Sequence, residues 1–594
     1  MIENRNLILA VVLSVAILLV SDFFFKLTRP APPPGTQETA EQKQAKQPPN
    51  ASSTSNIPAP ASNLQSRKLN PAIPIPPGSV IQDNTAKTRS TVISKGGRIR
   101  IDTPRLRGSI ALKGGIIDDL LLTNYRETLD PKSDEIIIFT PKDMNNAYYA
   151  QFGWVPNGKF SVPNEETIWQ SDSRVMSPER PVTLSWNNGE GLVFKRTYSI
   201  DANYMFTITQ EVRGSNKDPK TLNAYGLVSR RGTPETTGFY ILHEGLLGVF
   251  NDTLTEIDYD DIQESGQIKQ ASVGGWIGIT DKYWLAALVP DQNSTNNTRF
   301  IYSKQNDIDT YQIDYVSPLQ TVAAGVTARA VNHLFVGAKE VRLLDSYEES
   351  LGVKRFDLAI DFGWFYFLTK PIFYALLWIN NHVLNLGVSI LLLTVCIKLL
   401  FFPLANKSYA SMSKMKKLQP KIMKLRERHG DDKMKMNQEM MDLYKKEKVN
   451  PASGCLPILV QIPVFFALYK VLFVTIEMRH APFFGWILDL SAPDPTTMFN
   501  LFGIIPWSPP EFLMIGVWPL IMGATMYLQQ KLNPQPADPV QAKIFMFLPL
   551  FFTFLLAQFP AGLVIYWAWN NLLSILQQWV IMRRMGLTGK QALQ

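Results

Sequence analysis

Lys398 is the residue whose type and position most clearly could do chemistry, because it is a lone cation in the apolar run LLLTVCIKLLFFPL. Thr394 precedes it by four residues, so both side chains would share one face of a helix. A cation at the centre of a membrane span costs about 2.5–3.5 kcal/mol, and such a cation usually faces water or a partner. The alternative is that Lys398 snorkels to the membrane surface, because it lies about 9 Å along a helix from Leu404.

Uncharged polar residues lie in other apolar runs and could complete a site around Lys398. Gln461 lies early in one run. A second run carries a polar stripe at helical spacing, which consists of Tyr566, Asn570, Asn571, Ser574, Gln577 and Gln578. Hydrogen bonds between helices are the ordinary use of such residues. No acidic residue lies within any C-terminal apolar run to pair with the lysine, and this favours a hydrated cavity over a closed helix bundle.

Sequence motifs for covalent, nucleotide-dependent or metal chemistry are missing. There is no GxxxxGK[ST], Rossmann glycine pattern or GxSxG, and the five histidines are far apart with no HExxH or CxxC. We therefore expect no catalytic residue, no metal site and no cofactor. The two cysteines, Cys396 and Cys455, lie in or beside apolar runs, so residues 29–360 have no disulfide framework.

Membrane-spanning helices are the elements that would position these residues. Residues 544–582 contain no charged residue over 39 positions, which excludes an ordinary soluble domain. A bilayer core about 30 Å thick requires roughly 20 apolar helical residues. The sequence predicts an uncleaved first span at 7–25, with a cleaved signal peptide as the alternative. Five further spans are predicted at about 384–404, 456–476, 512–530, 543–559 and 561–582, the last two joined by a tight Pro-Ala-Gly turn.

The distribution of positive charge predicts the orientation of these spans. Residues 404–450 hold thirteen Lys/Arg against six Asp/Glu, a net charge of +7 out of +8 for the whole chain. Short loops rich in Lys and Arg stay in the cytoplasm. This segment should therefore be cytoplasmic, with 477–511 and 26–383 outside and both ends of the chain inside, including a short tail at 586–594.

The long polar region after the first span consists of two segments that differ in composition. Residues 29–89 are rich in Pro, Gln, Ser and Asn and predict a disordered tether. Residues 90–345 predict a large antiparallel β-sandwich, because short alternating runs recur, such as Leu192–Ile200, Met205–Val212 and Thr310–Val316. We expect a scaffold or docking domain. The alternative is a carbohydrate-active domain with His243 and Glu244 in a cleft.

Residues 346–383 would connect this domain to the second span. Within them, 349–365 mixes charged residues with Phe, Leu, Ile and Trp, which suits an amphipathic helix lying in the outer membrane interface. A simple connector is equally compatible. Farther along, Lys470 lies in an otherwise apolar span and is expected to snorkel outward.

Residues 405–450 predict two helices around a turn at 429–432, paired as an antiparallel hairpin. Seven of the 19 methionines lie here, and methionine is common on surfaces that accept many apolar partners. Packing between the two arms is the simpler explanation. The excess of Lys and Arg either only marks the cytoplasmic side or also binds ribosomal RNA or anionic headgroups.

The part from about 350 to 585 resembles the bacterial members of the YidC/Oxa family of membrane insertases. The stretches that carry the resemblance are DFGWFYF, TVCIKLLFFPLANKSYASMSKMKKLQPKI, GDDKMKMNQEMMDLYKKEKVNP, GCLPILVQIPVFFALY and FPAGLVIYWAWNN. The anchor, tether and β domain are similar to the Gram-negative form. The implied fold is a multi-pass α-helical membrane protein of six spans. It has a five-helix insertase core, a cytoplasmic helical hairpin and a periplasmic antiparallel β-supersandwich similar to sugar mutarotases.

The resemblance also implies roles for single residues. Lys398 matches the groove arginine of the family, and the other implied groove positions are Thr394, Gln461, Tyr566, Trp567 and Asn571. The candidates in the hairpin, which the family needs for insertion, are Met412, Met415, Lys416, Lys417, Met440 and Met441. Two departures matter: lysine lacks the bidentate fork of arginine, and Trp567 replaces a tyrosine and so lacks its hydroxyl.

The implied function is insertion and folding of inner-membrane proteins, alone or beside the Sec translocon. A cationic groove open to the cytoplasm would attract acidic stretches of a client, whose apolar segment then enters lipid with a gain of about 25 cal/mol per Å². The implied partners are nascent membrane proteins, the Sec translocon, the ribosome and signal-recognition machinery, and the bilayer, with no DNA. The alternatives are a small-solute transporter, which would favour intramembrane carboxylates or inverted repeats, and a membrane-anchored carbohydrate-binding protein.

Overall fold

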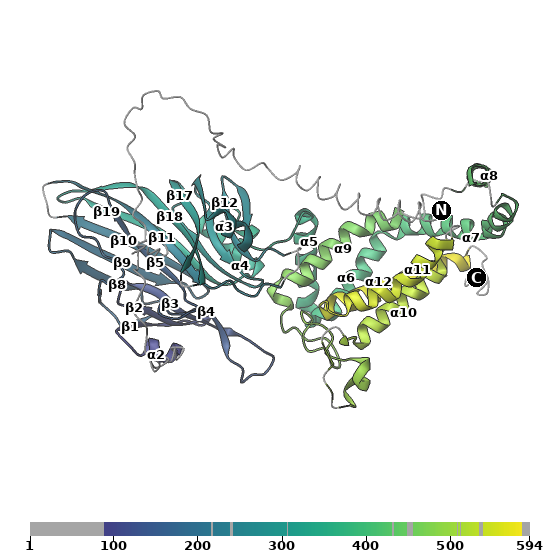
Figure 1. Cartoon of the computed structure of the whole chain (residues 1–594), viewed down its shortest axis with the longest axis horizontal. Coiled ribbons are helices and arrows are strands. Elements are labelled where there is room, and N and C mark those ends of the chain that lie inside the picture. Colours follow the sequence, from purple (N-terminus) through teal and green to yellow (C-terminus); the bar gives the residue numbers. More distant parts are fainter. Residues whose placement is uncertain are drawn as a thin grey trace, which may run out of the picture. The chain divides into compact units, whose positions relative to one another are not determined.

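The structure is a computed structural model. It describes residues 88–584 apart from 215–217, 238–241, 306, 430–432, 448, 450–455, 506, 508, 511–512 and 534–538. The predicted first span at 7–25 lies outside the described residues, as does nearly all of the predicted tether. The described residues build a β part followed by a helical part (Figure 1).

Two β-sheets make up the β part. The strands of the first sheet are β1 Arg98–Asp102, β2 Leu106–Ala111, β3 Ile116–Arg126, β4 Glu135–Phe139, β5 Tyr148–Pro156, β7 Val175–Met176, β11 Lys220–Arg231, β14 Gln267–Val273, β17 Thr295–Gln305 and β18 Ile308–Val322. Those of the second are β6 Gln170–Ser171, β8 Val182–Asn187, β9 Leu192–Ile200, β10 Met205–Gly214, β12 Gly245–Phe250, β13 Thr253–Ile257, β15 Trp276–Thr280, β16 Trp284–Val289 and β19 Thr327–Ala338. Two short helices, α2 (Arg89–Ile93) and α3 (Tyr259–Ser265), accompany them.

The two sheets form a sandwich. The first has the order β14-β17-β18-β11-β5-β3-β2-β1-β7, with β4 beside β3, and the second has the order β13-β12-β15-β16-β19-β10-β9-β8-β6. Neighbouring strands are antiparallel except β1 and β7. Apolar side chains of both sheets share one core, in which the rings of Phe250 and Phe300 lie 6.0 Å apart. The predicted antiparallel sandwich is confirmed.

Strand β9 shows why the alternating pattern predicts this arrangement. Every second side chain from Leu192 to Ile200 is buried, and those between them are partly or fully exposed. Arg196 is the charged exception on the buried face, where its guanidinium donates to the carbonyl of Gly115 at 3.2 Å and lies 4.6 Å from the ring of Trp169. The buried charge is thus solvated by protein groups instead of water.

The connector between the two parts differs from the predicted interfacial helix. Helix α4 spans Val341–Leu351, a 3-10 turn η1 spans Phe356–Ala359, and the next helix begins at Tyr366. A continuous helix over 349–365 is therefore wrong. Gly352 and Gly363 have φ of 66° and 72°, a left-handed conformation that glycine adopts without strain, and Gly352 is the C-cap residue at which α4 ends. Phe356 is buried against Trp276, with ring centroids 5.4 Å apart, so this segment packs on protein.

The helical part follows from residue 366. Its elements are α5 Tyr366–Val383, α6 Leu386–Leu400, α7 Phe402–His429, α8 Lys433–Lys446, α9 Leu456–Val474, η3 Ile476–Met478, η4 Met498–Gly503, α10 Val517–Leu532, α11 Pro539–Leu556 and α12 Ala561–Arg584. Judged by length and composition, none of the described helices could cross a bilayer alone, whereas α6 and α7 up to Leu425 could do so together as a pair bent by 69°.

The bend between α6 and α7 changes the position of Lys398. The sequence predicts one helix over 384–404, but α6 ends at Leu400. Pro403 explains the break, because proline has no N–H for the carbonyl of Leu399 and its ring would collide with that carbonyl in a straight helix. Lys398 therefore lies in the last turn of α6.

Just beyond α9, Glu477 in η3 carries a buried carboxylate. Its Oε2 atom has no hydrogen-bond partner among the described residues, and the carboxylate accepts from the backbone N–H of Val341, the first residue of α4. Burial, together with the nearby charge of Glu340, raises the pKa of Glu477 to about 7. Glu477 is thus a titratable contact between α4 and the end of α9.

We expect Glu477→Gln to make the unfolding temperature less dependent on pH. Glu477 binds its proton more tightly in the folded chain than in the unfolded chain, where the pKa is 4.5. The stability of the wild type should therefore fall as the pH rises from about 4.5 to about 7, by at most about 3 kcal/mol. Thermal unfolding of the detergent-solubilised chain at several pH values measures this. Glu349→Gln, on an exposed position of α4, is the control, and equal pH profiles for wild type and Glu477→Gln would contradict the assignment.

Candidate functional site

Lys398 points its ammonium group toward α12. Its Nζ donates a hydrogen bond to Ser574 Oγ at 2.8 Å, and the side-chain amide of Gln577 donates to the backbone carbonyl of Lys398 at 3.5 Å. Ser574 is buried, and its own hydroxyl donates to the carbonyl of Asn570 at 2.8 Å. The hydroxyl oxygen thus serves as an oriented acceptor for the ammonium between two helices.

A small cavity adjoins the ammonium group. Its volume is about 30 Å³, and it is lined by Lys398, Phe401, Leu404, Ala405, Tyr409, Gln461 and Gln577. A cavity of this size holds about two water molecules when polar groups are there to bond them. The lining combines one cation with a phenol and two amides, and none of the lining residues is acidic.

A second layer of polar groups lies behind this cavity. Gln461 donates to the hydroxyl of Tyr566 at 3.3 Å, and Tyr566 is 1% exposed. The side-chain carbonyl oxygens of Asn570 and Gln577 are buried and have no hydrogen-bond partner among the described residues. Because buried polar atoms are almost always paired, such oxygens indicate a place where water or a ligand group completes the network.

The structure brings together only part of the predicted groove. Lys398 and Gln461 line the cavity and Tyr566 supports Gln461, whereas the other three predicted residues make different contacts. The hydroxyl of Thr394 donates to the carbonyl of Ile390 at 2.7 Å, in its own helix. The amide of Asn571 donates to Thr525 Oγ1 at 3.5 Å, on α10.

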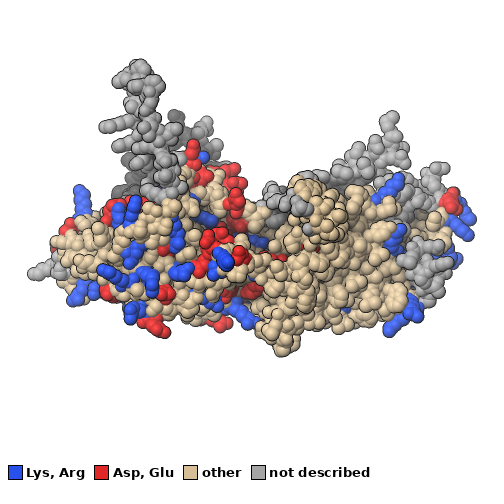
Figure 2. Space-filling view, turned by 90° about the horizontal axis from the view of Figure 1, so that it is seen from below, with Lys and Arg blue, Asp and Glu red and all other residues tan. Residues whose placement is uncertain are grey.

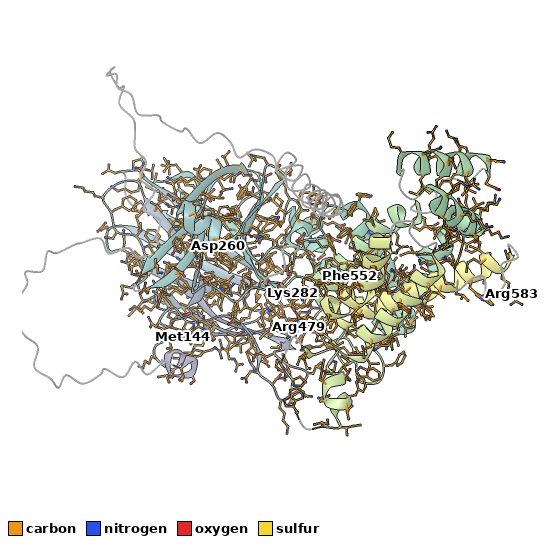
Figure 3. All side chains as sticks on the ribbon, turned by 45° about the vertical axis from the view of Figure 1, so that its right-hand side comes forward. Met144, Asp260, Lys282, Arg479, Phe552 and Arg583 are labelled. Atoms are coloured by element: carbon orange, nitrogen blue, oxygen red, sulfur yellow. The ribbon has the colours of Figure 1, made fainter. Side chains whose placement is uncertain are left out.

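Trp567 packs among aromatic rings. Its ring lies 4.9 Å from that of Phe465 on α9 and 5.9 Å from that of Phe552 on α11, and Phe552 is labelled in Figure 3. Trp567 therefore joins three helices beside the cavity. In the described residues it does not line the cavity itself.

The sequence reasoning missed the contribution of α7. Phe401, Leu404, Ala405 and Tyr409 line the cavity because the chain bends by 69° directly after Lys398. In a straight helix Tyr409 would lie about 16 Å from Lys398 along the axis. Pro403 is the signal in the sequence that marks this bend.

The predicted basic segment contains α7 and α8, whose arms are joined by an ion pair between Lys421 and Glu447 at 2.7 Å. Among its candidate residues, Met412, Met415 and Met440 are half-buried, and Lys417 and Met441 are exposed. Lys416 is buried instead, and its ammonium donates to the carbonyl of Lys531 in the last turn of α10 at 3.4 Å. A cation there satisfies a carbonyl that a helix end leaves unpaired.

Cations near the C-terminal end of α9 are paired with carboxylates or aromatic rings. Lys470 does not snorkel outward as predicted, because its ammonium donates to Asp361 Oδ2 at 2.7 Å. Nearby, Lys282 Nζ lies 4.1 Å from the ring centre of Phe473, and the guanidinium of Arg479 lies 5.6 Å from that of Trp284. Figure 3 shows Lys282 and Arg479 in the same region. The acid at Asp361 offers Lys470 a partner that the local sequence around the lysine does not reveal.

Two family models match the chain. The model of the YidC periplasmic domain matches residues 98–375, and the model described as 60Kd inner membrane protein matches residues 378–588. The first match covers the β part, and the second covers α6 to α12 and hence the cavity.

Curated relatives match over nearly their whole length. The protein named Membrane protein insertase YidC from Methylobacterium radiotolerans is 49% identical over 595 residues, which cover 98% of this chain and 96% of the relative. The protein of that name from Bradyrhizobium diazoefficiens is 50% identical over 609 residues, covering 99% and 97%. The one from Rickettsia rickettsii is 48% identical over 578 residues, covering 97% and 98%.

Solved structures are more distant. A crystal structure described as an active YidC insertase is 20% identical, covers 81% of this chain and 92% of its own, and has a TM-score of 0.34. A galactose mutarotase-like protein from Lactobacillus casei is 10% identical, covers 41% of this chain and 100% of its own, and has a TM-score of 0.30. Because both TM-scores are low, the assignment of this chain depends on the sequence matches.

We expect a cysteine at position 398 to react with a water-soluble maleimide in membranes. Only a hydrated thiol ionises to the reactive thiolate. The matched control is Leu399→Cys. Leu399 is the next residue and does not line the cavity, and its side chain is 65% exposed on the outside of α6, where we expect lipid instead of water. With Cys396 and Cys455 replaced by serine, Lys398→Cys should react and Leu399→Cys should not. Equal protection of both would contradict a hydrated cavity.

We expect Lys416→Ala to lower the unfolding temperature more than Lys417→Ala. The first substitution leaves the carbonyl of Lys531 without its buried donor, at a cost of about 1 kcal/mol or more, whereas Lys417 is exposed. Thermal unfolding of both variants in detergent compares a buried lysine with its exposed neighbour. Equal effects would show that the contact with α10 does not contribute to stability.

Proposed function

Because the chain belongs to the YidC family of membrane protein insertases, we propose that the cavity at Lys398 is part of the groove that receives polar stretches of its client proteins. The insertase function follows from relatives that are 49% and 50% identical over nearly the whole chain. The observation that carries the proposal for the groove is the ammonium of Lys398, which lies 2.8 Å from a neutral hydroxyl and adjoins a cavity whose lining includes a phenol and two amides.

The charge of the cavity would select what enters it. Lys398 is the one cation among its lining residues, and no acid there neutralises it. Coulomb attraction is several-fold stronger in a protein interior than in water, so an acidic stretch of a client gains more from this cation than it would from an exposed one. The amides of Gln461 and Gln577 and the phenol of Tyr409 would replace hydrogen bonds that the client loses with water.

The shape of α6 would shorten the apolar barrier. Helix α6 has 15 residues, which corresponds to about 22 Å, less than the roughly 30 Å of a bilayer core. Because Lys398 lies in the last turn of α6, a polar stretch that reaches the cavity from the α7 side would have only the remaining part of the core to cross. Entry of the client's apolar segment into lipid would supply the driving force, at about 25 cal/mol per Å².

The proposed arrangement in the membrane has six spans, both ends of the chain in the cytoplasm and the β part in the periplasm. The net charge of +7 in residues 404–450 supports a cytoplasmic position of α7 and α8. The match of residues 98–375 to a periplasmic domain supports the opposite side for the β part. Thr394, Trp567 and Asn571 would then line the groove when a client has opened it.

The proposed partners follow from the same arrangement. Helices α7 and α8 carry exposed basic residues, among them Lys417, which would face the cytoplasm in the proposed arrangement. Such a surface would bind phosphates, so we propose contact with the ribosome, the signal-recognition machinery or anionic lipids. For clients with long translocated regions, we propose that the insertase acts beside the Sec translocon.

We expect Lys398→Glu to block insertion of a client whose translocated tail is acidic, while Lys398→Arg is tolerated. A glutamate would repel the tail, and an arginine keeps the charge. Protection of the tail from external protease, measured in cells depleted of the native insertase, reports insertion.

A client with the same apolar segment and a neutral tail is the control. We expect Lys398→Glu to reduce its insertion much less than that of the acidic client. Full protection of the acidic tail in the charge-reversed variant would contradict the groove proposal.

A further inference from the structure

The loop between α9 and α10 carries an apolar tip. Residues 495–510 are part of the loop between Arg479 and Gly516, and they contain no charged residue. The described apolar side chains here are largely exposed. We call the following six residues the tip: Phe499, Leu501, Phe502, Ile504, Ile505 and Trp507. Ile504 is 80% exposed and Leu501 is 53% exposed. In Figure 1 this loop projects downward beside α10.

The base of the loop is rigidly built around Asp494. This carboxylate is 2% exposed and accepts from Trp486 Nε1 at 3.1 Å, from the backbone N–H of Thr496 at 3.0 Å and from the backbone N–H of Trp518 in α10 at 2.9 Å. The N–H of Val517 donates to Thr496 Oγ1 at 3.0 Å. The base thus holds the tip at a fixed position relative to the start of α10.

The tip has a defined conformation of its own. Leu501 and Phe502 have φ of 49° and 57°, in the left-handed region that residues with side chains disfavour. The N–H of Phe502 donates to the carbonyl of Thr497 at 2.9 Å, and that of Ile505 donates to the carbonyl of Asn500 at 3.0 Å. Strain of this kind persists only where the surrounding bonds enforce it, and here its effect is to turn two large apolar side chains outward.

The tip continues a charge-free surface of the helical part. Figure 2 shows lysines and arginines gathered at one end of the helical part and a broad surface without charged residues over the rest. Exposed apolar side chains of α11, such as Phe551 and Leu555, belong to the helices that the family match assigns to an inner-membrane protein. The tip therefore shares the chemistry of a surface that faces lipid.

We propose that the tip inserts into the outer leaflet of the membrane, where its side chains contact lipid acyl chains and Trp507 lies near the headgroups. Tryptophan prefers that interface, and apolar side chains prefer the hydrocarbon. Through Asp494 and Trp518, the inserted tip fixes the depth of α10 and α9 at the end of the bundle opposite α7. The choice of the outer leaflet depends on the proposed orientation of the chain. The insertion of the tip into lipid does not depend on that orientation.

The test uses the full chain with Cys396 and Cys455 replaced by serine and a fluorescent label on one new cysteine. Ile504→Cys and Leu501→Cys report the tip, Leu555→Cys on α11 is the lipid control, and Asn293→Cys on an exposed turn of the β part is the water control. The labelled chain is reconstituted into vesicles of phosphatidylethanolamine and phosphatidylglycerol. Quenching by lipids with a nitroxide on the acyl chain is compared with quenching by iodide in the water.

We expect labels on the tip to behave like the label at 555, with strong nitroxide quenching and weak iodide quenching. Adding Ile504→Asp to the Leu501→Cys chain should reverse this, because the charge draws the tip toward water. Strong iodide quenching at 501 and 504 without the aspartate would overturn the proposal. Protection from both quenchers would also overturn it, because a protein surface would then cover the tip. No client protein is present, so the result is independent of the groove proposal.

Discussion

The break between α6 and α7 is the constraint on which the candidate site depends. Pro403 removes one backbone hydrogen bond at this break, and with the 69° bend the residues Phe401, Leu404 and Tyr409 line the cavity beside Lys398. A continuous span would have extended these residues along the membrane normal and left the lysine facing the side of one helix. The cavity is therefore a consequence of backbone geometry first and of side-chain polarity second.

The partners of the buried cations separate structural roles from the proposed functional one. Lys370 on α5 donates to Asp345 at 2.8 Å and to Asp357 at 3.1 Å, and Lys470 donates to Asp361 at 2.7 Å. In each case the ammonium is paired with at least one carboxylate, and the contact joins the connector to a helix. Lys398 bonds a hydroxyl instead, and among the described residues it forms no ion pair with a carboxylate. This difference is what supports the proposed role of Lys398 in the groove.

Local patterns predicted the regular elements well and the junctions poorly. The alternating run predicted at Leu192–Ile200 is β9 itself, and the predicted turn before Ala561 separates α11 from α12. Both predictions depend only on residues that are close together in the sequence, because alternation and proline determine the backbone locally. The interfacial helix over 349–365 failed because Phe356 is buried by Trp276, which is 80 residues away in the sequence. Hydropathy measures the affinity of a segment for an apolar environment, but not whether lipid or protein supplies that environment.

The same limit explains the site. Composition identified Lys398 and the polar stripe of α12, yet nothing in the sequence shows which of these polar side chains contacts Lys398, since that depends on how α6 and α12 rotate against each other. The structure selects Ser574 and Gln577, whereas Asn571 turns to α10. The two ends of the helical part then differ in kind: one combines a cation with neutral polar groups beside a basic hairpin, and the other exposes a charge-free tip. In the proposed arrangement, the polar end receives the client while the apolar tip holds the opposite end of the helices in lipid.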